Sequence, residues 1–280
     1  MENIFLTIAI ILSIGFAHLF KIAQNMGCKQ IVVITVNYFV AAILLICFHF
    51  YKGIPEISSK MLSVGITTGI IFTLTLKITT YSLNHLPVNL VMMVFRLSIF
   101  VPVIFALFLW NESLTLSQFL GICLCFISIF FMSPNSKEST KTISKVLLLI
   151  SLVILGQGLS QTGLQAIHYM GLDPVFLFVL MIIFISASIT GIVIILITKQ
   201  NITKIDLSMG TFIGAYNLIG LAVTLKTMTM ISPALFWPLN GCVTVVIDAI
   251  ISHYIWKDYL TIKKIIGVAI SIPSILLILL

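Results

Sequence analysis

The chain has 280 residues, of which 60% are hydrophobic and 8% are charged. An ordinary soluble domain carries about 25% charged residues, so a soluble fold is excluded and lipid must surround most of this chain. The 15 basic residues outnumber the 8 acidic ones, but they lie between apolar runs rather than in one basic stripe. This pattern excludes a nucleic-acid interface and favours loop charges that face lipid head groups.

Ten apolar runs follow one another along the chain, each close to the roughly 20 residues that a membrane helix needs. The first has neither the basic region nor the cleavage site of a signal peptide, so we expect it to be retained as a span. Proline and polar residues separate the runs, as at Ser232-Pro233. The predicted spans lie near 4–22, 31–51, 61–84, 88–110, 115–133, 146–170, 174–198, 207–230, 233–256 and 261–280.

One motif occurs twice. WNESLTLSQFLG, Trp110 to Gly121, returns as WKDYLTIKKIIG, Trp256 to Gly267, with Trp, an acid, Leu-Thr and Gly at the same spacing. A polar linker, residues 134–145, separates a first five-helix repeat, residues 1–133, from a second, residues 146–280. Five is an odd number of spans, so the second repeat must enter the membrane from the opposite face. The sequence therefore predicts an all-α membrane protein with ten transmembrane helices arranged as two inverted repeats.

The run PVIFALFLWNESLTLSQFLGICLCFISIFF, Pro102 to Phe131, resembles the hallmark of the EamA-like branch of the drug/metabolite transporter superfamily. The elements of that hallmark found here are Pro102, Glu112, Leu114, Thr115 and Gly121, with Asn111 where the family usually has Gly. The resemblance implies ten spans in two five-helix repeats, a role in transport, and cytoplasmic termini. These motifs characterise the fold and leave the substrate open.

Charged side chains inside the spans indicate a functional site, because burying them in lipid is costly. At about 1.5 Å of rise per residue, Lys77, Arg96 and Asp248 reach one level, about 8 to 12 Å from the face opposite the termini. His18 comes to a similar level. Asp248 can neutralise one cation, which leaves one positive charge for a substrate carboxylate or phosphate, and Arg suits a bidentate contact.

Helical periodicity adds polar neighbours to these charges. The residues predicted to bind substrate are Lys77, Tyr81, Arg96, Gln157, Gln161, Trp237 and Asn240, and those predicted to couple protons or form an ion pair are Asp248 and His18. Structural alternatives are equally concrete. Lys77, Arg96 and Asp248 would form an ion pair between spans, Trp237 would anchor the membrane interface, the glutamines would join helices, and Lys226 would extend toward the head groups.

The leading functional hypothesis is a secondary transporter in the cell membrane that moves a small polar, anionic or zwitterionic metabolite by alternating access. The sequence lacks Walker A, HExxH and GxSxG patterns, so we expect neither an ATP-driven pump nor an enzyme, and its cysteines lack metal-ligand spacing, so we expect no metal or cofactor. Proton coupling through Asp248 or His18 and uncoupled exchange are both compatible. The alternatives are an exporter of organic cations or drugs, and a non-transporting regulatory or lipid-binding membrane subunit.

The orientation of the chain is predicted in two conflicting ways. Ten lysines fall on the face opposite the termini, against Lys52 and Lys60 in loops on the termini's face. The positive-inside rule therefore places the termini outside, whereas the resemblance implies that they are cytoplasmic. The sequence leaves the orientation open, together with the direction of transport and the oligomeric state.

Overall fold

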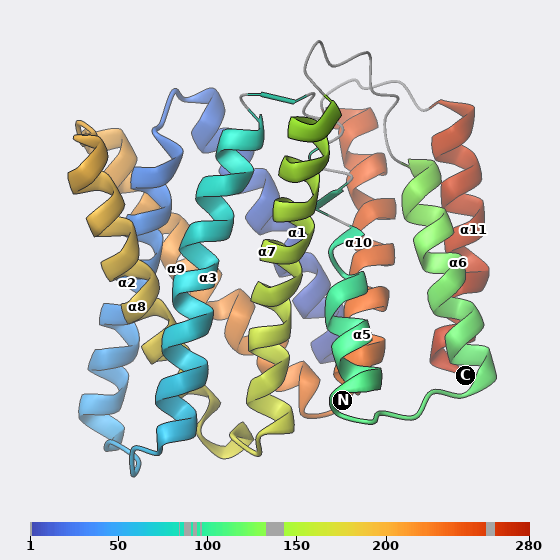
Figure 1. The fold of residues 1–280 in the computed structure, drawn as a ribbon, viewed down its shortest axis with the longest axis horizontal. Helices are drawn as coiled ribbons and strands as arrows, with labels where there is room; N and C mark the ends of the chain where they lie inside the picture. Colours follow the sequence, from blue (N-terminus) through green and yellow to red (C-terminus); the bar gives the residue numbers. More distant parts are fainter. Residues whose placement is uncertain are drawn as a thin grey trace. The chain divides into compact units, whose positions relative to one another are not determined.

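The computed structural model describes residues 2–83, 85–86, 91, 94–95, 97–132, 143–255 and 261–280. All regular secondary structure in these residues is helical (Figure 1). The helices are α1 (Glu2–Asn25), α2 (Gln30–Lys52), α3 (Ser59–Leu83), α5 (Phe100–Phe108), α6 (Leu116–Met132), α7 (Ile143–Tyr169), the 3-10 turn η1 (Asp173–Val175), α8 (Phe176–Thr198), α9 (Lys204–Met228), α10 (Pro233–Ile255) and α11 (Ile262–Leu279).

The helices begin and end close to the predicted spans. Within the predicted span near 88–110, the helix that the structure describes is α5. Residues 134–142 of the predicted linker lie outside the described residues. Among the described residues, six helical segments are long and apolar enough to cross a membrane: Ile4–Asn25, Gln30–Lys52, Ser59–Ser82, Lys145–Tyr169, Asp173–Thr198 and Lys204–Met228. Two shorter apolar helices cover Leu116–Phe131 and Ile265–Leu279.

The chain folds into two compact units, each of which takes segments from both halves of the sequence. Unit 1 contains Met1–Lys77 and Leu159–Met230, and unit 2 contains Ile78–Gly158 and Ile231–Leu280. Helices α3 and α7 therefore contribute to both units. The predicted linker at residues 134–145 divides the sequence into repeats and not into these compact units, and that division stays a prediction.

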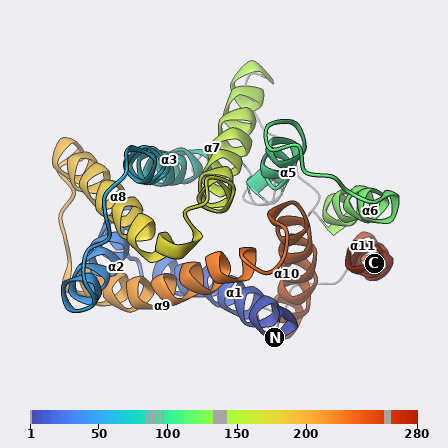
Figure 2. The same ribbon diagram turned by 90° about the horizontal axis from the view of Figure 1, so that it is seen from below.

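Unit 1 is held together where glycines let helices approach closely. In this unit α2 contacts both α8 and α9 (Figure 2). A Cβ placed on Gly65 of α3 would lie 2.7 Å from Ile182 Cβ of α8, and one on Gly210 of α9 would lie 2.6 Å from Val36 Cβ of α2. Small residues four apart, here Gly65 with Gly69 and Gly210 with Gly214, are typical of tight packing between membrane helices.

These two contacts use equivalent positions of the two halves. Adding 145 to Gly65 and Gly69 gives Gly210 and Gly214, and adding 146 to Val36 gives Ile182. Each glycine pair also faces the same turn of its partner, since the first glycine of each pair approaches the carbonyl oxygens of Val179 and Val33, which are again 146 residues apart. The packing of α3 on α8 is thus repeated by the packing of α9 on α2.

Unit 2 shows the same correspondence in hydrogen bonds. Ser128 Oγ of α6 donates to the Gly267 carbonyl of α11 at 2.7 Å, and Ser274 Oγ of α11 donates to the Gly121 carbonyl of α6 at 2.8 Å. The residues of one bond correspond to those of the other, since Gly267 follows Gly121 by 146 residues and Ser274 follows Ser128 by the same number. The contacts run in opposite senses along the two helices, so α6 and α11 are antiparallel (Figure 1). Each helix thus contributes one glycine carbonyl and one serine hydroxyl to the contact with the other.

Candidate functional site

The structure places the predicted site residues in both units. Lys77, Gln161 and His18 belong to unit 1, whereas Tyr81, Gln157, Trp237 and Asn240 belong to unit 2. Asp248 lies in α10, but its side chain is outside the described part, and Arg96 lies wholly outside the described residues. The predicted meeting of Lys77, Arg96 and Asp248 is therefore not tested and stays a prediction.

In unit 1, one helix crossing brings two of the predicted residues near the same contact. Thr75 Oγ1 of α3 lies 3.4 Å from Ser160 Oγ of α7, and both side chains are buried. Lys77 follows Thr75 by two residues and is exposed, while Gln161 follows Ser160 directly. Gln161 Oε1 is buried, and no described residue donates a hydrogen bond to it. A buried acceptor without a partner is a candidate for contact with a ligand or water.

His18 lies on a different helix of unit 1. It is half-buried on α1, which packs against α9 where Gly15 meets the Tyr216 side chain. No contact that we describe joins His18 to the crossing of α3 and α7, so its shared level with Lys77 stays a prediction.

In unit 2, two glycines place predicted polar residues beside one short segment. A Cβ on Gly158 of α7 would lie 2.9 Å from the Ser98 carbonyl oxygen, and one on Gly241 of α10 would collide with the Ile99 side chain. Gln157 precedes Gly158 and Asn240 precedes Gly241, and both are half-buried. Helices α7 and α10 thus both pack against residues 98–101, which follow Arg96 in the sequence.

Trp237 is the most deeply buried of the predicted site residues whose side chains the structure describes, with 6% of its surface exposed. Its indole Nε1 is buried and has no hydrogen-bond acceptor among the described residues. A tryptophan that anchors the membrane interface keeps this group in contact with head groups, so the burial favours an interior role. Pro238, the next residue, lies inside α10 and has no backbone N–H to donate to the preceding turn.

The remaining polar residues of unit 2 have local contacts. Asn240 Oδ1 accepts a hydrogen bond from Thr244 Oγ1 at 3.5 Å. Tyr81 is 54% exposed, and its ring stacks on His85 at a centroid distance of 4.0 Å. Tyr81 is thus oriented by a neighbour on its own segment, and its phenol is open to a ligand.

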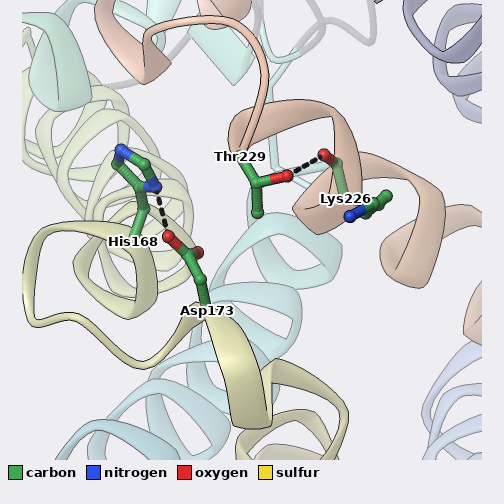
Figure 3. A network of polar contacts seen from close by, with 4 residues as sticks. All are labelled: His168, Asp173, Lys226 and Thr229. Carbon is green, nitrogen blue, oxygen red and sulfur yellow. Dashed lines mark hydrogen bonds and ion pairs between the residues drawn. The ribbon is translucent and has the colours of Figure 1, made fainter. Parts of the chain in front are cut away.

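A histidine and aspartate pair in unit 1 was not predicted. His168 Nδ1, in the last turn of α7, lies 2.8 Å from Asp173 Oδ2 at the start of η1 (Figure 3). In the same view, Thr229 Oγ1 donates to the Lys226 carbonyl at 2.8 Å and closes the end of α9. A His and an Asp five residues apart across a glycine turn are common enough that the spacing alone does not identify the pair.

The glycine pairs were also missed, although their spacing is visible in the sequence. Gly65 with Gly69 and Gly210 with Gly214 both follow the small-residue pattern of membrane helix contacts. Their correspondence at a separation of 145 residues pairs the predicted span near 61–84 with the one near 207–230.

Comparison with known proteins gives a family for the first half of the chain and a fold for nearly all of it. Residues 3–133 match the EamA-like transporter family. A solved structure described only as the crystal structure of a protein has a TM-score of 0.76 and 11% identity, and the alignment covers 99% of this chain and 95% of that one. At this identity the likeness shows the fold alone. No curated protein matches. The family resemblance inferred from Pro102 to Phe131 is confirmed.

Proposed function

We propose that this chain, a multi-pass membrane protein whose residues 3–133 belong to the EamA-like transporter family, is a secondary transporter that works by alternating access. Membrane transport follows from the family. The ten-span inverted architecture, the substrate class and the alternating-access mechanism are proposed here.

The reciprocal hydrogen bonds of α6 and α11 carry this proposal. Ser128 with Gly267 and Ser274 with Gly121 are one contact made twice, on antiparallel helices. A two-fold axis relating these antiparallel helices would run across them and would turn one repeat upside down relative to the other. The equivalent glycine contacts in unit 1 support the same relation. Inverted repeats suit alternating access, since exchanging their conformations opens the site to the opposite face.

We propose that the substrate is small, polar, and anionic or zwitterionic. Lys77 is exposed and would offer its ammonium group to a carboxylate or phosphate, and Arg96 would add a bidentate contact. Gln161 Oε1 of unit 1 and Trp237 Nε1 of unit 2 are each buried and unpaired among the described residues, so each is a candidate contact for a polar group of the substrate. Tyr81, Gln157 and Asn240 would complete the site.

Ligand binding to the detergent-purified chain tests the substrate class first. We expect amino acids, organic acids or sugar phosphates to raise the melting temperature, and Arg96→Gln to abolish that rise while retaining the ligand-free melting temperature. Lys60→Gln is the matched control, because it removes an exposed lysine from the first turns of α3 and should leave binding intact. Stabilisation by quaternary amines alone would instead assign the protein to organic cation export.

Flux in proteoliposomes tests transport itself. The stabilising compound should exchange across vesicles that contain only this chain, and Trp237→Phe, which removes the indole N–H but retains an aromatic ring, should lower the apparent affinity. Absence of flux for every bound compound would favour a regulatory subunit.

Proton coupling through Asp248 or His18 is a separate part of the proposal. A pH gradient should drive uptake in the wild type, and Asp248→Asn should retain exchange while losing the pH-driven component. Unchanged pH-driven uptake in both Asp248→Asn and His18→Gln would show that neither residue couples proton movement to transport.

A further inference from the structure

Unit 1 carries an apolar groove whose lining excludes a polar substrate. The groove has a volume of about 400 Å³ and lies between α2, α8 and α9. Its walls include Leu44 and Phe48 of α2, Leu177 of α8, and Ile219, Ala222 and Val223 of α9. Leu44, Phe48 and Ile219 are also exposed, so the groove opens on the surface that these membrane-spanning helices present. A hydrocarbon chain fits such a lining, because the groove offers it contact without a polar group to desolvate.

A lysine stands beyond the groove on each of the two main lining helices. Lys52 follows Phe48 by four residues, and its Nζ lies 5.5 Å from the centre of the Phe48 ring. Lys226 follows Val223 by three residues, which places it on the same face of α9 one turn further on. The glycine contacts show that α2 and α9 run parallel, so both lysines lie at the same end of the groove.

Both ammonium groups lack an acidic partner in the described part of the chain, and both side chains are exposed. The acid at this end of α8, Asp173, is bonded to His168 at 2.8 Å instead (Figure 3). The Thr229 hydroxyl bonds to the Lys226 carbonyl and so fixes the turn that carries this lysine. Two positive charges without an ion-pair partner among the described residues therefore stand at one end of the apolar groove.

We propose that this groove binds an anionic phospholipid, with an acyl chain along Leu44, Phe48 and Ile219 and the phosphate contacted by Lys52 and Lys226. The order of groups matches a lipid, since the apolar stretch is followed within one helical turn by positive charge at the helix ends, where head groups lie. The site is separate from the proposed substrate site and does not depend on the transport function.

Lipid titration of the full-length chain in detergent tests the proposal. Phosphatidylglycerol and phosphatidylcholine with identical acyl chains are compared by native mass spectrometry and by melting temperature. We expect phosphatidylglycerol to bind more tightly, and each of Lys52→Gln and Lys226→Gln to weaken it about fivefold, as one lysine near an anionic surface contributes. The double variant should lose the preference for phosphatidylglycerol. Lys60→Gln, which removes an exposed lysine that does not line the groove, should retain it.

A second variant separates the acyl chain from the head group. Ala222→Phe fills the groove and should weaken both lipids, whereas Leu207→Phe, at an exposed position near the other end of α9, should weaken neither. The lipid-free melting temperature shows that each variant is folded.

Three results would overturn the proposal. The first is equal binding of the two lipids by the wild type, or a preference that survives in the double lysine variant. The second is equal stabilisation by glycerol phosphate, which has the head-group phosphate without an acyl chain. The third is cross-linking between copies through Ile219→Cys that phosphatidylglycerol does not suppress, which would assign the groove to a second copy of the chain.

Discussion

The two glycine contacts of unit 1 are built alike but carry different polar groups. Where α3 packs on α8, Ser186 Oγ donates to the Gly65 carbonyl at 3.2 Å and Thr73 Oγ1 donates to the Ala187 carbonyl at 2.8 Å. Where α9 packs on α2, the bond joins two side chains, from Asn217 Nδ2 to Asn37 Oδ1 at 3.2 Å. Close backbone packing is repeated because small residues suffice for it, while the side chains around it have diverged between the halves.

The N-termini of α3 and α9, the helices that carry these glycines, also share a backbone contact and differ in a side chain. Ser58 and Met61 at the start of α3 correspond to Thr203 and Asp206 at the start of α9, at the same separation of 145 residues. Ser58 Oγ accepts from Met61 N at 3.3 Å, and Thr203 Oγ1 accepts from Asp206 N at 3.2 Å. Only Asp206 adds carboxylate contacts, because its oxygens accept from Thr203 N at 3.0 Å and from Lys29 N at 2.9 Å.

The largest expected effect tests the glycine packing. In Gly69→Ala the new Cβ would overlap Ser186 Oγ and the Ile183 carbonyl oxygen. We expect this overpacking to lower the free energy of unfolding by about 3 kcal/mol. In Gly214→Ala the new Cβ would lie 2.7 Å from the Asn37 carbonyl oxygen, so a smaller loss of about 1 to 2 kcal/mol is expected. Denaturant titration in micelles, followed by helical circular dichroism, measures both.

Gly220→Ala is the control for these variants, because its Cβ would meet only Leu12 Cβ at 3.7 Å, an ordinary contact. It should be neutral or slightly stabilising, since Ala favours the helix over Gly. If Gly69→Ala were as stable as Gly220→Ala, the close packing of α3 on α8 would be wrong.

Asp206→Ala should have the next largest effect. Asp206 is 1% exposed, and its removal leaves the Thr203 and Lys29 amides without an acceptor. We expect a loss of about 2 kcal/mol, against about 0.5 to 1 kcal/mol for Ser58→Ala at the corresponding cap. The same titration compares them. Equal losses would mean that the contact with Lys29 adds nothing beyond an ordinary helix cap.

The hydrogen bond between the Asn37 and Asn217 side chains tests the polar difference between the two glycine contacts. Asn217→Leu should lower the free energy of unfolding by about 1 kcal/mol, because the buried side-chain oxygen Asn37 Oδ1 loses its donor. The double variant with Asn37→Leu should cost less than the sum of the two single variants, since no amide is then left unsatisfied. A double-mutant cycle gives the coupling, and strict additivity would show that the two amides do not interact.

The long helices could be predicted from the sequence, because each of them is apolar and bounded by residues that end helices. Pro233 begins α10 where it was predicted to, and α8 ends at Thr198 as predicted. The duplicated motif also predicted that Gly121 and Gly267 are equivalent. The physical reason for this equivalence needed the structure, because only there does each glycine carbonyl accept a hydrogen bond from a serine of the other helix.

The site was less predictable, because depth along a helix does not fix the direction in which a side chain points. Lys77 was placed by its depth and proves to be exposed, whereas Trp237 was compatible with an interface or an interior position and proves to be buried. The lysines of the groove are further examples, since Lys52 and Lys226 become neighbours of one groove only through the parallel packing of α2 and α9.

The smallest effect gives the strictest test of the proposed two-fold relation between the repeats. Ser128→Ala and Ser274→Ala each remove one of the reciprocal bonds, and each should cost about 0.6 kcal/mol, a typical value for a hydrogen bond between membrane helices. Both serines are essentially fully buried, so the two losses should be equal within error, and the double variant should lose their sum. A clearly larger loss at one serine would mean that α6 and α11 use these positions differently, and the repeat would then be one of sequence and backbone only.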